Sequence, residues 1–209
     1  MTLTNIRWLG HSSFLIEAEE GGIIYIDPYE TKSDIMADYI FITHSHYDHL
    51  SIKDILRISN GETVIFAPLD AKPKLKDFSG KTVYVEPNNI YQHEDIVVYT
   101  KPAYNIESSF HPMSNNWVGY IIEIDSKRYY HAGDTDLLDE LKDIEDIFVA
   151  MLPIGGTYTM DAEKAAELAN TIRPRYAIPM HYGTVVGDKK DAERFKELFN
   201  GETIIMKKE

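Results

Sequence analysis

The chain has 209 residues, with 44% hydrophobic and 26% charged residues, which fits one domain of ordinary globular composition over residues 1–209. It has no cysteine, which excludes disulfides, thiolate metal ligands and a cysteine nucleophile. A net charge of -13 argues against general nucleic-acid binding. No basic start followed by an apolar run is visible, and no apolar run approaches the ~18 residues of a membrane span. We therefore expect a cytoplasmic protein with no membrane partner.

The first part of the chain is predicted to be rich in strands. Short β-branched and aromatic runs broken by glycines indicate strands at 6–9, 13–17, 23–26 and 38–43. Gly21-Gly22 is the expected turn between the second and third of these. Ser51 has the spacing of a helix N-cap before an apolar-periodic run that begins at Ile52. The stretch between the strand at 38–43 and the helix that begins at Ile52 is therefore predicted to be a loop.

Later segments alternate strands with helices. Strands are expected at 63–67, 82–86, 96–101, 118–124, 128–131, 147–153, 176–180 and 203–206. Helices are expected at 137–142, 162–172 and 191–199, with Asp161 as the N-cap of the second. This order predicts an α/β (α+β) fold built from packed layers of sheet and helix.

The predicted loop reads THSHYDHL from Thr43 to Leu50 and holds three histidines and an aspartate. His44 and His46 stand two residues apart where the chain leaves a strand, so their side chains can point to the same side. Asp48 and His49 follow as the chain turns into the helix and can face a second point nearby. Imidazole and carboxylate groups are suitable ligands for zinc, iron or manganese. A solvated polar loop is the alternative at this stage.

Two later segments place ligand-type residues directly after predicted strands. Asp134 follows a strand and a tight turn in the segment YYHAGDT, and His181 follows a buried strand in AIPMHYG. Functional side chains commonly lie on loops at strand ends, held by a rigid scaffold. The repeated placement favours a metal site over a loop that is polar by chance.

These segments resemble the metallo-β-lactamase superfamily. HSHYDH matches its HxHxDH signature, and HAGDT and PMHYG match its later aspartate and histidine segments in the right order. The opening WLGHSSFLIE with DPY resembles the branch of metal-dependent hydrolases that contains L-ascorbate-6-phosphate lactonase. The likeness covers essentially the whole chain and implies a four-layer αββα sandwich with a dinuclear metal centre. Zinc is the expected metal, with manganese or iron as alternatives.

The resemblance also implies how the ligands are divided between the two ions. His44 and His46 would bind the first ion, and Asp134 would bridge both ions. Asp48, His49 and His181 would bind the second ion.

The third ligand of the first ion departs from the family pattern. Related proteins often have a histidine soon after a Pro-Ala pair, whereas this chain has Pro102-Ala103-Tyr104-Asn105. The next histidine is His111, which we favour because imidazole binds these metals better than a neutral amide does. Asn105 is the alternative, and a first ion with an open position is a further one.

Three further residues lie near the predicted site. The resemblance places His11 close to it, either in contact with substrate, in support of a ligand, or in a structural role. Asp27 is expected to support the histidine loop rather than to bind metal. His131 is expected either to lie beneath Asp134 as a supporting residue or to be a hydrogen-bonded core histidine.

The predicted function is a metal-dependent hydrolase that cleaves a small ester, lactone or phosphoester. A hydroxide shared by two metal ions would attack the substrate, Asp134 would fix the spacing of the ions, and Asp48 could orient the hydroxide. A nuclease or phosphodiesterase and a non-catalytic metal-binding module are the alternatives. The expected partner is a small-molecule substrate, not a nucleic acid.

Overall fold

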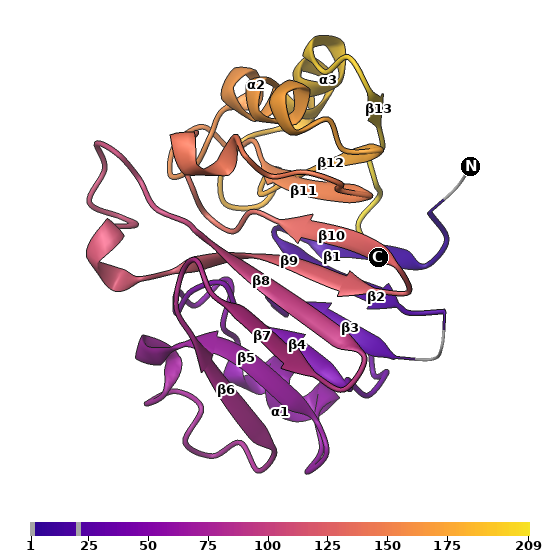
Figure 1. The fold of residues 1–209 in the computed structure, drawn as a ribbon, viewed down its shortest axis with the longest axis vertical. Coiled ribbons are helices and arrows are strands. Elements are labelled where there is room, and N and C mark those ends of the chain that lie inside the picture. Colours follow the sequence, from indigo (N-terminus) through magenta and orange to yellow (C-terminus); the bar gives the residue numbers. More distant parts are fainter. Residues whose placement is uncertain (1–2, 20–21) are drawn as a thin grey trace. The chain divides into compact units, whose positions relative to one another are not determined.

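A computed structural model describes residues 3–19 and 22–209 (Figure 1). The chain divides into two compact units: a first unit of Met1–Glu86 with Met206–Glu209, and a second unit of Pro87–Ile205. Each unit is built around one mixed sheet. No helix in the described residues is both long enough and apolar enough to cross a membrane.

The sheet of the first unit has six strands in chain order within the described residues. They are β1 (Ile6–Gly10), β2 (Ser13–Glu17), β3 (Ile23–Ile26), β4 (Tyr39–Phe41), β5 (Val64–Pro68) and β6 (Lys81–Val85). β1, β2 and β3 pair antiparallel, and β3 to β6 pair parallel. β2 and β3 therefore pair as predicted, while Gly21 of the expected turn lies outside the described residues.

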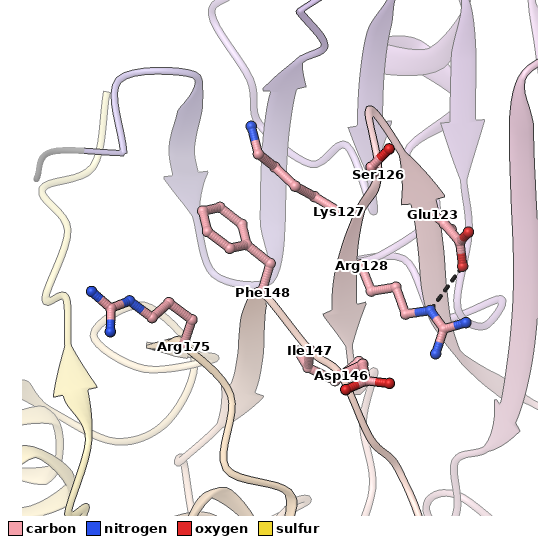
Figure 2. A pocket seen from close by; sticks show the side chains of 8 residues that line it. All are labelled: Glu123, Ser126, Lys127, Arg128, Asp146, Ile147, Phe148 and Arg175. Atoms are coloured by element: carbon pink, nitrogen blue, oxygen red, sulfur yellow. Dashed lines mark hydrogen bonds and ion pairs between the residues drawn. The ribbon is translucent and has the colours of Figure 1, made fainter.

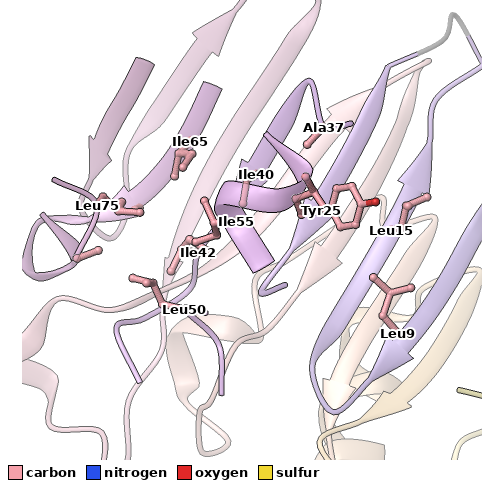
Figure 3. Packing of buried hydrophobic residues seen from close by; sticks show 13 residues of the cluster. Leu9, Leu15, Tyr25, Ala37, Ile40, Ile42, Leu50, Ile55, Ile65 and Leu75 are labelled. Carbon is pink, nitrogen blue, oxygen red and sulfur yellow. The ribbon is translucent and has the colours of Figure 1, made fainter. Parts of the chain in front are cut away.

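One face of this sheet is covered by the helix α1 (Ile52–Ile58). The pairing aligns Leu15, Tyr25, Ile40 and Ile65 in one row across four strands. All four side chains are fully buried in one cluster with Ile55 and Ile58 of α1 (Figure 3). Ser51 caps the helix as predicted, because its hydroxyl accepts a hydrogen bond from the N–H of Asp54. A short 3-10 turn, η1 (Leu69–Ala71), follows β5.

The sheet of the second unit has seven strands in the order β13-β12-β11-β10-β9-β8-β7. They are β7 (Ile90–His93), β8 (Ile96–Pro102), β9 (Val118–Ile124), β10 (Lys127–His131), β11 (Val149–Pro153), β12 (Tyr176–Met180) and β13 (Glu202–Thr203). β7 to β10 pair antiparallel, and β10 to β13 pair parallel. Both units therefore join an antiparallel part to a parallel part.

Two helices connect the parallel strands of the second unit and lie side by side (Figure 1). α2 (Ala162–Ile172) has the predicted bounds, with Asp161 accepting a hydrogen bond from the N–H of Lys164 at 2.8 Å. α3 (Lys189–Leu198) begins two residues earlier than predicted, behind a capping box at Asp188. Arg194 of α3 pairs with Glu163 of α2 at 2.9 Å.

Several predicted elements were wrong in detail. The helix expected at 137–142 is only a 3-10 turn, η3 (Asp139–Leu141), and a second such turn is η2 (Met113–Asn115). The last strand has two residues, Glu202–Thr203, and does not extend to 206. β7 was not predicted, because its side chains are exposed or half-buried and it pairs only along the edge of the sheet.

Candidate metal centre

His44 and His46 of the first unit face each other in the loop after β4. Nε2 of His44 lies 3.1 Å from Nδ1 of His46, and the ring of His44 lies 4.0 Å from that of His49 between centroids. The predicted same-side arrangement at i and i+2 is therefore present. Two ring nitrogens at this separation can bind one ion or share one proton.

Asp27 holds this loop in place from the end of β3. Its carboxylate is fully buried and accepts hydrogen bonds from the N–H of Thr43 at 2.8 Å and from the Thr43 hydroxyl at 2.6 Å. It also accepts from Nδ1 of His49 at 2.7 Å. Because a carboxylate only accepts, Nδ1 of His49 carries the proton and Nε2 keeps the lone pair that a metal needs. The supporting role predicted for Asp27 is confirmed.

His11 and Asp48 form a second contact in the first unit. Nε2 of His11 lies 3.1 Å from Oδ2 of Asp48, and both residues are buried. His11 occupies the turn between β1 and β2, where Trp8 donates its indole N–H to the His11 carbonyl at 2.8 Å. The structure thus places His11 against a predicted ligand, in the position of a supporting residue.

Three predicted ligands of the second unit meet at one carboxylate oxygen. Oδ2 of Asp134 lies 3.3 Å from Nε2 of His111 and 3.0 Å from Nε2 of His181. Asp134 follows β10, His181 follows β12, and His111 lies in the loop after β8. All three residues are at most 4% exposed, so this is a buried cluster of titratable groups and not a solvated polar loop.

Asn105 is a partner of His111 within this cluster. Its Oδ1 accepts hydrogen bonds from Nδ1 of His111 at 2.8 Å and from the His111 N–H at 3.2 Å. Its Nδ2 donates to the Tyr158 carbonyl at 2.9 Å and to Asp136 at 3.2 Å. These bonds use both ends of the amide and direct Nε2 of His111 toward Asp134. This geometry favours His111 over Asn105 as the ligand. The sequence did not suggest the role of Asn105 as a hydrogen-bond partner of His111.

The site residues carry an unusual share of strained backbone. His11, Asp27 and His181 all have positive φ angles, of 53°, 46° and 59°. Residues other than glycine rarely adopt this conformation, and in proteins it concentrates at functional sites. Each of the three lies directly after a strand, at β1, β3 and β12.

One histidine and two tyrosines lie near the predicted ligands. His131 is fully buried on β10, and its Nδ1 accepts a hydrogen bond from the N–H of Gly133 at 3.2 Å, which fixes the turn before Asp134. Burial raises the pKa of Tyr182, as it does, together with the charge of Glu30, for the pKa of Tyr29. Both phenols are therefore neutral near pH 7.

The donor set fits a divalent transition metal. Within the first unit, ring nitrogens of His44 and His46 lie 3.1 Å apart, and within the second unit two imidazole nitrogens lie against one carboxylate oxygen of Asp134. Imidazole nitrogen and carboxylate oxygen are the ligands that zinc, iron and manganese accept in proteins. Each unit thus contains imidazole and carboxylate donors of the type that these metals bind, and hydrogen bonds fix the orientation of several of them.

A separate cavity of about 460 Å³ lies at the opposite ends of the strands in the second unit (Figure 2). Lys127, Phe148 and Arg175 line it, and Arg128 forms an ion pair with Glu123 beside it at 2.8 Å. It contains none of the predicted ligands, so its volume has no bearing on the metal centre.

The sequence is similar to those of known proteins. The model of the β-lactamase superfamily domain matches residues 5–181, which include every predicted ligand. The chain belongs to the β-lactamase superfamily. A UPF0173 metal-dependent hydrolase of Pyrococcus horikoshii is 32% identical, over 98% of this chain and 97% of its own. A UPF0173 metal-dependent hydrolase of Carboxydothermus hydrogenoformans is 33% identical, over 96% of this chain and 99% of its own.

Two solved structures share this fold. The crystal structure of a putative metal-dependent hydrolase from Parabacteroides distasonis has a TM-score of 0.85. Its sequence is 31% identical, and the match covers 96% of this chain and 91% of that one. A metallo hydrolase from Ignicoccus hospitalis is 27% identical, with a TM-score of 0.78 over 97% of this chain and 94% of its own. The predicted fold class, an α/β sandwich of the metallo-β-lactamase type, is confirmed. The single-domain assignment and the individual ligand roles stay predictions.

Proposed function

We propose that this chain is a hydrolase that uses two divalent metal ions, with zinc as the expected metal, to cleave a small ester, lactone or phosphoester. The observation that supports it most is the contact of two imidazole Nε2 atoms with one buried oxygen of Asp134. As the family resemblance implies, His44, His46 and His111 would hold the first ion, and Asp48, His49 and His181 would hold the second. Asp134 would be a ligand of both.

Bound divalent ions would supply Lewis acidity, which polarises a carbonyl or phosphoryl oxygen and brings the pKa of a bound water to about 7. The residues of this chain provide the orientation for that chemistry. Asp27 fixes the tautomer of His49, and Asn105 fixes that of His111. Such partners hold ligand rings in place, and a carboxylate partner also makes the imidazole more basic.

Asp48 and His11 have a different part in this proposal. The contact at 3.1 Å holds one oxygen of Asp48 toward the His11 ring and leaves the orientation of the carboxylate restricted. In that position Asp48 can accept a proton from water while it remains a ligand. We place Asp134 and Asp48 in the catalytic set, with His11 as a residue that positions Asp48.

The proposed substrate is a small molecule, and we expect the chain not to bind nucleic acid. The chain carries 34 acidic and 21 basic residues, so its long-range field repels polyanions. RNA or DNA binding that weakens steeply with salt would contradict this assignment.

Metal content and hydrolysis, measured on one preparation, test the function. We expect up to two transition-metal ions per chain by elemental analysis, and hydrolysis of at least one of a set of esters, lactones and phosphodiesters by zinc- or manganese-loaded protein. Asp134→Ala should lower the metal content and reduce turnover at least about a hundredfold, because several kcal/mol of charge stabilisation are lost. Full activity of stringently metal-free protein would contradict the proposal.

His93→Ala is a matched control for the histidine ligands. His93 ends β7, outside the loops that hold the predicted ligands. Its replacement should leave metal content and turnover unchanged, whereas His181→Ala should lower both. Equal losses in the two variants would indicate a general effect of removing a histidine rather than the loss of a ligand.

A further inference from the structure

An aromatic pair lies on the rim of the candidate ligands of the second unit. Phe110 directly precedes the buried ligand His111 but is itself 54% exposed. Its ring packs edge-to-face against the half-buried ring of Tyr158, with centroids 4.6 Å apart. Ile106, in the same loop, is 66% exposed. Apolar side chains are thus presented to solvent within a few residues of a predicted metal ligand.

The backbone on both sides of the pair is held by hydrogen bonds. Asn105 donates to the Tyr158 carbonyl at 2.9 Å while its Oδ1 holds His111. The N–H of Phe110 donates to the Ser108 hydroxyl at 3.2 Å. The same asparagine therefore fixes the ligand and the loop that carries its aromatic neighbour. A surface ordered in advance in this way loses little conformational entropy when it binds a ligand.

The residues around the pair disfavour an anionic group at the pair itself. The segments 103–117, 132–138 and 154–160 contain no lysine and no arginine. Glu107 and Asp136 add negative charge to the same loops. Phosphate and carboxylate groups are usually recognised by arginine, lysine or clusters of backbone N–H groups. The cationic side chains needed for that recognition are absent from these segments.

We propose that Phe110 and Tyr158 form a subsite for the apolar, preferentially aryl, part of an uncharged ester or lactone substrate. This inference rests on the proposed hydrolase function and narrows its substrate class. The aryl group would pack on the Phe110 ring while the scissile carbonyl lies toward His111 and Asp134. Aromatic pairs of this kind add up to about tenfold in affinity beyond the area they bury.

Binding of two hydroxamates to zinc-loaded protein tests the subsite without any turnover. Acetohydroxamate and benzohydroxamate carry the same chelating group and differ in the phenyl ring. We expect benzohydroxamate to bind about tenfold more tightly by calorimetry. Phe110→Ala and Tyr158→Ala should each bring the ratio toward one at unchanged metal content. Ile90→Ala, which removes another exposed apolar side chain from the second unit, should keep the wild-type ratio.

Hydrolysis of 4-nitrophenyl phenylacetate, acetate and phosphate provides the second measurement. The phenylacetate should have the highest kcat/KM, and Phe110→Ala should raise its KM with little change in kcat. A phenyl preference in binding without hydrolysis of any substrate would support the subsite and count against the hydrolase function. Hydrolysis with no phenyl preference, or a preference for the phosphate, would overturn the subsite and leave the hydrolase function standing.

Discussion

The two units use different groups to orient a histidine of the predicted metal centre. In the first unit a fully buried carboxylate, that of Asp27, accepts the Nδ1 proton of His49. In the second unit a neutral amide, that of Asn105, accepts the Nδ1 proton of His111. Both arrangements leave Nε2 as the nitrogen available for metal. The difference shows that the tautomer can be fixed by an ionised or by an uncharged partner.

The energetic consequences of the two arrangements differ. Asp27 also holds the backbone and hydroxyl of Thr43, so it joins the end of β3 to the loop after β4. Asn105 joins three loops, through His111, Asp136 and the Tyr158 carbonyl. A buried charge with three donors matters for folding, because its removal leaves those donors without an acceptor. An amide at a loop junction matters more for the geometry of the site.

Asp27→Ala should have the largest effect on stability. Three buried donors, two from Thr43 and one from His49, would lose their acceptor, and we expect a loss of about 3–5 kcal/mol in the free energy of unfolding. Urea denaturation of the metal-free protein measures it, so that metal loss does not contribute. Asp38→Ala is the control. Asp38 is exposed, and its carboxylate accepts a hydrogen bond of 2.7 Å from the Ile23 N–H. Similar losses in both variants would contradict the role of Asp27.

Asn105→Ala should act on metal affinity more than on folding. Loss of a supporting hydrogen bond to a ligand typically weakens metal binding about 10–100-fold. We expect this change in a zinc titration against a competing chelator, with the number of ions at saturation unchanged. His111→Ala should instead lower the number of ions bound.

The same titration separates the two candidates for the third ligand. If Asn105→Ala removes an ion and His111→Ala does not, Asn105 is the ligand and the assignment made here is wrong. Asn105→Asp keeps an acceptor for the Nδ1 proton of His111 but loses the donor to the Tyr158 carbonyl. Its affinity should therefore lie between those of wild type and Asn105→Ala.

The sequence predicted the elements whose signals are local. α2 was predicted with its observed bounds because an N-cap aspartate, an apolar period and a proline after its end all act within a few residues. The helix expected at 137–142 failed because its two buried leucines, Leu138 and Leu141, are three apart, a spacing that a single 3-10 turn satisfies equally well. Local spacing alone does not decide between the two.

The candidate site was predicted in its chemistry and only partly in its supports. Consecutive histidines and aspartates after strands identified ligand-type residues, since donor type and strand position can be read from sequence. The role of Asn105 depends on how the loop from 103 to 117 folds back, and no periodicity encodes that path. Phe110 was missed for the same reason: an exposed phenylalanine in a loop has no meaning until its neighbours in space are known.

Charge pairs provide the smallest expected difference between the units. Arg57 of the first unit bonds the Thr31 carbonyl and pairs with Asp54 at 2.9 Å, where the Asp54 side chain is only 9% exposed. Arg57→Gln should lower the free energy of unfolding by about 1–2 kcal/mol, because a nearly buried carboxylate loses its charged donor. Arg194 of the second unit pairs with Glu163 on the surface, and this pairing lowers the pKa of Glu163.

Arg194→Gln should therefore cause almost no change at neutral pH, since exposed pairs contribute little. A carboxyl group whose pKa is lowered on folding contributes stability at pH values above its pKa in the unfolded state. This contribution is lost as the pH falls through its pKa in the folded state. Any effect of Arg194→Gln should disappear below the pKa of Glu163, and added salt should reduce it. Urea denaturation of both variants at pH 7 and in acid measures this. A larger loss in Arg194→Gln than in Arg57→Gln would mean that burial does not set the strength of these pairs.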